Sequence, residues 1–139
     1  MIGRLPTTLE VAGEERKIRT DFRDMLVIMQ AFADPELQPA EKYDVMLMIL
    51  YDDLDSIPME ATEEAIKQGL WFLDCGQQED DKRPPVKVMD WEQDESLVFP
   101  AVNKVAGREV RAVEYMHWWT FMGYFMAVSY THLTLPTIR

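Results

Sequence analysis

Few side chains in this sequence have a type and spacing that could carry chemistry. The chain has two histidines, His117 and His132, and one cysteine, Cys75. A structural zinc site typically uses four nitrogen or sulfur ligands in paired spacings, which these three residues do not supply. No Gly-x-Ser-x-Gly turn marks a serine nucleophile, and no glycine-rich loop is present to bind phosphate. We therefore expect a protein that is not an enzyme and that uses no metal and no cofactor.

Residues 53–64 come closest to a metal-binding loop. Acidic residues stand at the first, third and twelfth positions of this segment, as in a calcium loop. The sixth position of such a loop needs glycine for a sharp turn, and this chain has Pro58 there. We therefore predict a turn between two helices, with the hydroxyl of Thr62 capping the second helix.

Charge is distributed unevenly along the 139 residues, which carry a net charge of −11. Residues 1–100 contain 23 acidic and 10 basic side chains (net −13), whereas residues 101–139 contain 2 and 4 (net +2). A surface of negative sign repels phosphate backbones, so we expect no nucleic-acid partner. One cysteine cannot form an internal disulfide, and no basic leader with a long apolar stretch follows Met1, so a cytoplasmic protein is expected.

The first twenty residues have the pattern of a β-hairpin. Apolar or β-branched residues alternate with polar ones over residues 5–11 and 16–20, on either side of a glycine-bearing turn at residues 12–15. An isolated hairpin is only marginally stable in water. Its inner face, Leu9, Val11 and Ile18, is therefore expected to rest on the helices that follow.

Helical periodicity recurs five times after the hairpin. The predicted helices begin near residues 21, 39, 62, 90 and 113, and they end near residues 34, 50, 76, 107 and 128. A polar segment with two adjacent prolines, residues 77–89, is predicted as an exposed connector. The expected fold is mainly α, a single helical domain over residues 1–128 in which the N-terminal hairpin packs on a bundle of about five helices.

Apolar residues at helical spacing define the core that these helices are predicted to share. The predicted core positions are Phe22, Met25, Leu26, Met29, Phe32, Tyr43, Met46, Leu47, Leu50, Ile66, Gly69, Leu70, Leu73, Leu97, Val98, Ala101, Val102 and Val105. Ten methionines are many for this length, and most fall on apolar faces, namely Met25, Met29, Met46, Met48, Met122 and Met126. Filling of the core is the favoured interpretation, although methionine is also frequent on surfaces that bind variable helices.

The last predicted helix contains no charged residue over residues 116–128. Thirteen residues are too few to span a bilayer, which needs about 20, so no membrane association is expected. A helix that is apolar on all sides is either buried or covered by a partner. Seven of its residues are candidates for the core or for partner binding: Tyr115, His117, Trp118, Trp119, Phe121, Met122 and Phe125. For His117 we expect a helical histidine that is hydrogen-bonded through one ring nitrogen, because no nucleophile pattern accompanies it.

Five segments carry a resemblance to a known family. The most specific is the string His-Trp-Trp-x-Phe within residues 114–125, and the others are residues 20–23 (Thr-Asp-Phe-Arg), residues 71–76 (Trp-Phe-Leu-Asp-Cys-Gly), residues 90–94 and residues 98–107. Together they make residues 1–128 resemble the bacteriophage gene-product-fifteen family of siphophages and of prophages in Gram-positive bacteria.

The resemblance implies a role in phage tail morphogenesis. Genes of this family lie between those of the major tail protein and the tape-measure protein, where tail assembly chaperones are encoded. A chaperone of this kind would cover the tape-measure protein in the cytoplasm of the host bacterium and be absent from the finished particle. The alternatives are a structural component of the tail, bound to another tail protein, and an acidic decoy that mimics DNA.

The end of the chain departs from the family pattern. Members of the family usually continue into a basic segment rich in lysine and arginine, which this sequence lacks. Residues 128–136 instead resemble translated adapter sequence, so residues 129–139 are expected to be non-native. Loss of the natural segment would leave part of the surface of residues 115–125 uncovered, and we therefore expect self-association.

Overall fold

The computed structural model describes residues 3–76 and 91–134, with side chains described in 3–76 and 95–128. The chain folds into a β-hairpin, β1 (Thr8–Val11) and β2 (Glu14–Lys17), followed by helical elements. The α-helices are α1 (Phe22–Ala33), α2 (Pro39–Leu50), α3 (Thr62–Leu73), α4 (Trp91–Ala106) and α5 (Trp118–Thr134). Three short 3₁₀ turns are η1 (Leu54–Ser56), η2 (Met59–Ala61) and η4 (Val110–Ala112). The prediction of a mainly α fold with an N-terminal hairpin is confirmed.

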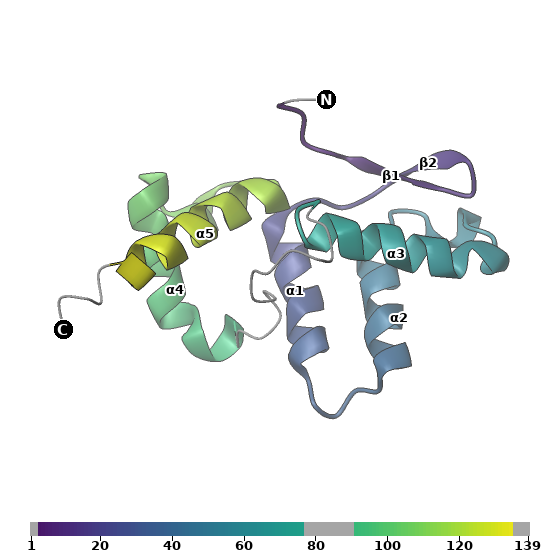
Figure 1. The fold of residues 1–139 in the computed structure, drawn as a ribbon, viewed down its shortest axis with the longest axis horizontal. Helices are drawn as coiled ribbons and strands as arrows, with labels where there is room; N and C mark the ends of the chain where they lie inside the picture. The colour runs from purple at the N-terminus through teal and green to yellow at the C-terminus, as the bar shows by residue number, and fades with distance from the viewer. Residues whose placement is uncertain (1–2, 77–90, 135–139) are drawn as a thin grey trace.

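The helices form two groups on either side of α1 (Figure 1). Helices α1 and α2 run antiparallel, and α3 crosses one end of this pair. The β-hairpin lies along α3. Helices α4 and α5 pack against each other and against the opposite side of α1. Helix α1 is therefore the element that both groups share.

The hairpin is shorter than the sequence pattern predicts, with four paired residues on each strand. The turn consists of Ala12 and Gly13, both with positive φ (55° and 78°), as a two-residue turn of the primed type requires. Leu9, Val11 and Ile18 are buried, as predicted. Helix α3 supports the turn directly, because a Glu64 carboxylate oxygen accepts the Ala12 N–H at 2.9 Å.

Helices α1 and α2 begin and end close to the predicted residues. Asp21 caps α1, and its carboxylate accepts the backbone N–H of Arg23 at 3.0 Å. Helix α1 ends at Ala33, just before Asp34 and Pro35, because proline disfavours helical geometry in the residue that precedes it. Helix α2 begins at Pro39, where the missing N–H of proline is not needed.

Residues 53–64 form the predicted connection between two helices, built from the turns η1 and η2. The cap predicted for the second helix is wrong. Thr62 is already the first residue of α3, and its hydroxyl donates to the Met59 carbonyl at 2.7 Å. Helix α3 packs closely on α2 at Gly69, where a Cβ atom would lie 3.0 Å from Leu50 Cδ2.

The predicted connector, residues 77–89, lies outside the described residues, and α4 follows it. Val98 and Val102 are buried as predicted, but Leu97 is 75% exposed and Val105 is also exposed. The difference arises from Phe99, which is buried and packs on the aromatic side chains of α1 and α5. Residues 97 and 99 lie about 200° apart around a helix, so burial of Phe99 turns Leu97 towards solvent.

Helix α5 differs from its prediction at both ends. It begins at Trp118 rather than near residue 113, because residues 113–117 are not helical and Met116 and Trp118 bond to the segment that enters α1. It continues beyond Val128 to Thr134. The non-native origin predicted for residues 129–139 stays a prediction.

Candidate functional site

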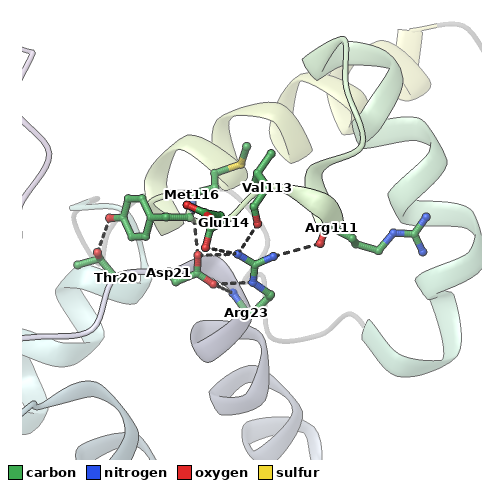
Figure 2. A network of polar contacts seen from close by, with 8 residues as sticks. Thr20, Asp21, Arg23, Arg111, Val113, Glu114 and Met116 are labelled. Carbon is green, nitrogen blue, oxygen red and sulfur yellow. Dashed lines mark hydrogen bonds and ion pairs between the residues drawn. The ribbon is translucent and has the colours of Figure 1, made fainter.

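Three of the segments that carry the family resemblance meet in space. Residues 20–23 lead into α1, residues 71–76 end α3, and residues 115–125 lead into α5 and form its first two turns. We call the contact between residues 20–23 and 111–118 the α1–α5 junction. Figure 2 shows its polar contacts, which the sequence pattern did not predict.

The carboxylate of Asp21 is the centre of the α1–α5 junction. Its Oδ2 atom accepts the backbone N–H and the Nε–H of Arg23, at 3.0 and 2.9 Å. Its Oδ1 atom accepts a second guanidinium N–H at 3.1 Å and the backbone N–H of Met116 at 3.0 Å. One side chain therefore caps α1, orients Arg23 and holds the segment that precedes α5.

The Arg23 side chain donates hydrogen bonds to backbone carbonyls that have no partner within a helix or strand. Its Nη2 atom donates to the carbonyls of Val113 and Glu114, at 2.9 and 3.0 Å, and Nη1 donates to that of Arg111 at 3.2 Å (Figure 2). The guanidinium also lies over the ring of Phe22, 4.8 Å from its centroid. The rigid, planar guanidinium of arginine can donate to several acceptors that lie in different directions, whereas the compact ammonium group of lysine cannot.

Backbone pairing completes the α1–α5 junction. Phe22 N–H donates to the Met116 carbonyl at 2.9 Å, and Trp118 N–H donates to the Thr20 carbonyl at 2.7 Å. The hydroxyls of Thr20 and Tyr115 form a further hydrogen bond. The start of α5 is thereby fixed to the start of α1 over ninety residues of sequence separation.

Residues 107–112, which lead into the junction, are held by their own contacts. Asn103 Oδ1 accepts the Val110 N–H at 2.8 Å, and Glu109 accepts both the backbone N–H and the Nε–H of Arg111, at 2.9 and 2.8 Å. The hydrogen bond from the Arg111 side chain, followed by that from its backbone, lowers the pKa of Glu109 to about 2. Arg111 lies over the ring of Phe99, 4.9 Å from its centroid, which joins this turn to α4.

His117 uses both ring nitrogens, which corrects the prediction of a mid-helix histidine with one bond. It stands immediately before α5, where Nδ1 accepts the Trp119 N–H at 3.0 Å and the carbonyl accepts the Phe121 N–H. Its Nε2 atom lies 2.7 Å from the Pro6 carbonyl. A carbonyl only accepts, so Nε2 carries the proton and the ring is the neutral tautomer that caps α5. Burial lowers the pKa of His117, and the bond to Pro6 opposes that shift.

Two indole groups bind the end of α3. Trp118 Nε1 donates to the Leu73 carbonyl at 3.0 Å, and Trp119 Nε1 donates to the Phe72 carbonyl at 2.8 Å. The last carbonyls of a helix lack a partner within it, and the Trp118 indole satisfies that of Leu73. The Phe72 carbonyl accepts the Trp119 indole in addition to the Cys75 N–H at 3.0 Å. Gly76 has φ +76°, and a Cβ atom there would lie 3.1 Å from Trp119 Cη2, which accounts for glycine at this position.

The seven candidate residues at the start of α5 differ in burial. Trp118 and Phe121 are fully buried, and His117 and Met122 are almost fully buried. Trp119 and Phe125 are half-buried, and Tyr115 is 54% exposed. Four of the seven therefore have little surface to offer a partner, and a binding role for Tyr115, Trp119 and Phe125 stays a prediction.

No metal or membrane site emerges from the part of the chain that the structure describes. Within it, no group of three or more histidine, cysteine, aspartate or glutamate side chains is placed to hold a metal ion. None of the helices described is long and apolar enough to cross a bilayer.

Replacing Arg23 by lysine is expected to lower the free energy of unfolding by about 1–3 kcal/mol, because lysine cannot bond to three carbonyls and Asp21 together. Chemical denaturation measures the change. Arg108 is exposed and forms no hydrogen bond or ion pair with the described residues, so Arg108→Lys is the matched control and should leave stability unchanged. Equal stability of the two variants would contradict the role given to Arg23.

Protonation of His117 should also lower the stability of the fold as the pH falls. Because burial depresses its pKa in the folded state, the unfolded chain binds the proton first, and stability is lost as pH falls below the unfolded value of about 6.5. Asparagine can cap a helix but does not titrate. Denaturation midpoints are measured from pH 8 downwards, across about two pH units that include the unfolded pKa. With decreasing pH, they should fall more steeply for the natural protein than for His117→Asn. Parallel curves would contradict this assignment.

The family model described as Bacteriophage Gp15 protein matches residues 1–134, which extends past residue 128 and covers all of α5. No curated protein and no solved structure matches the chain. The chain therefore belongs to the bacteriophage Gp15 protein family, whose role is in the structure and morphogenesis of phages.

Proposed function

We propose that this protein is a tail assembly chaperone that binds the tape-measure protein in the cytoplasm of the host bacterium. Membership of the bacteriophage Gp15 family, over residues 1–134, is the observation that carries the proposal. The family supports interaction with other phage proteins, and the tape-measure protein is the partner we propose. The proposed activity is binding, and no chemical step is needed for it.

The charge of the protein suits such a role. A tape-measure protein is long and rich in helices, and its apolar helix faces must be kept from associating before assembly. A chaperone with a net charge of −11 would make a complex with it more soluble, because like-charged complexes repel each other. Most of the charge lies in residues 1–100, which include α1, α2 and α3.

Exposed apolar side chains support a binding role as well. Of the six methionines on predicted apolar faces, Met25, Met29, Met46 and Met122 are buried and fill the core. Met48, in contrast, is 65% exposed, and Met59, Trp71 and Leu97 are exposed too. Adaptable apolar groups on an acidic surface are suited to partners whose helices vary in sequence.

A structural component of the tail is the second candidate, because the family is one of phage structural and morphogenesis proteins. The two candidates differ in whether the protein remains in the finished particle. Mass spectrometry of purified virions separates them. Absence of the protein supports the chaperone, and a stoichiometric amount would establish the structural component in its place.

Co-expression with the tape-measure gene of the same phage tests the proposal directly. We expect more soluble tape-measure protein in the presence of this partner, and we expect the two proteins to co-purify. The control is co-expression with an unrelated acidic helical protein, which should not change solubility. If the tape-measure protein is equally soluble in both cultures and no complex is recovered, the proposed function is wrong.

A further inference from the structure

A hollow of about 400 Å³ opens on the helical hairpin formed by α1 and α2. Its walls are Phe32 of α1, three residues of α2 and Leu70 of α3, where α3 crosses the pair (Figure 1). The three from α2 are Pro39, Lys42 and Tyr43. Its wall on α1, Phe32, is in the last turn of that helix, whereas the α1–α5 junction is at its first residues.

The lining of the hollow is mainly apolar and only partly covered. The rings of Phe32 and Tyr43 meet edge to face, with centroids 6.3 Å apart, and form one wall. Tyr43 is 37% exposed, and Phe32 and Leu70 are half-buried. The sequence pattern predicts all three as core residues, whereas in the structure each of them lines the hollow and is only partly buried.

The segment that supplies four of the five lining residues is acidic. Residues 31–44 carry four acidic side chains, Asp34, Glu36, Glu41 and Asp44, and one basic side chain, Lys42, for a net charge of −3. Lys42 is the charged side chain in the lining itself. None of the four carboxylates forms an ion pair within the described part of the chain, and Glu36, Glu41 and Asp44 are exposed. A hollow built from a segment with unpaired negative charge favours a partner that is apolar in the middle and basic at the edges.

The walls of the hollow also indicate the backbone form of the partner. One common way for an extended peptide to bind is to add main-chain hydrogen bonds to the edge of a sheet, and the sheet of the described chain, β1 and β2, does not line this hollow. The lining groups come from three helices, which satisfy their own backbones. A helix brings no unpaired backbone groups and can place one apolar face in such a groove.

We propose that this hollow is the docking site for a basic amphipathic α-helix, and that helices of this kind in the tape-measure protein are what it binds. The second half of this statement rests on the proposed function. The apolar face of the helix contacts Phe32, Tyr43 and Leu70, and its lysine or arginine side chains lie beside the carboxylates of residues 34–44.

A synthetic helical peptide of leucine and lysine, with leucine at helical spacing, is the probe for this site. Its binding to the full chain is measured by fluorescence anisotropy, and binding is expected. Two control peptides should bind more weakly, one with the same residues in scrambled order and one with a proline at its centre, which breaks the helix. Equal binding of all three peptides would overturn the requirement for an amphipathic helix.

Charge reversal locates the site. Replacing Glu36 and Asp44 together by lysine should weaken peptide binding by about tenfold, since attraction at two positions becomes repulsion. The matched control replaces Asp55 and Glu60, which are exposed acids of the connection between α2 and α3, and produces the same change in net charge. If both double variants lose the same affinity, the binding is a general effect of charge and the proposed site is wrong.

A second pair of variants tests the apolar wall. Tyr43→Ser should weaken peptide binding by about tenfold, because it removes a ring that the helix would cover, and Tyr43→Phe should retain it. Met48 is the control on the same helix, because it is more exposed than Tyr43 and does not line the hollow. If Tyr43→Ser and Met48→Ser bind the peptide as tightly as the natural protein, the hollow is not the docking site.

The same variants separate this inference from the proposed function when they are co-expressed with the tape-measure protein. Loss of the complex in the Glu36 and Asp44 variant and in Tyr43→Ser, but not in the control variants, supports both. If every variant still co-purifies with the tape-measure protein, the chaperone stands and the docking site is overturned. If the natural chain binds the peptide but not the tape-measure protein, the site stands and the choice of partner is overturned.

Discussion

The pairing of Asp21 with Arg23 is the interaction on which the arrangement of the two helical groups depends. Residues 111–117 end the 3₁₀ turn η4 and lead into α5, so several of their carbonyls have no partner within a regular element. The Arg23 guanidinium donates to three of these carbonyls, and the Asp21 carboxylate accepts the Met116 N–H while holding that guanidinium in place. Two neighbouring side chains at the start of α1 therefore attach this whole segment to the helix.

The family motifs are therefore largely a framework. The Thr-Asp-Phe-Arg segment forms one side of the α1–α5 junction, and the His-Trp-Trp segment caps α5 through His117 and binds the carbonyls at the end of α3. The Phe22 and Phe121 rings stack beneath it with centroids 4.5 Å apart. The polar groups of these side chains already have partners within the protein, where they join α1, α3 and α5. A partner is more readily bound elsewhere, and we place that site at the hollow between α1, α2 and α3.

Local patterns predicted much of this structure, and the failures have identifiable causes. Helices α1, α2 and α3 begin and end near their expected residues because proline, glycine and a capping aspartate mark those ends. The start of α5 differs from the prediction because Met116, His117 and Trp118 pair with residues 20–22, a contact distant in sequence. Burial of Phe99 likewise depends on aromatic rings from α1 and α5, which periodicity within α4 does not report. The hollow was missed for the same reason, since its walls come from three helices.

Hydrogen exchange of the protein alone and in complex with the tape-measure protein tests the central claim most directly. The claim is that the α1–α5 junction is a permanent framework and that binding takes place at the hollow. We predict that the amides of Phe22, Met116 and Trp118 are protected in the free protein and unchanged in the complex, while new protection appears at residues 32–44. Unprotected junction amides that become protected only in the complex, with no change at residues 32–44, would contradict the claim.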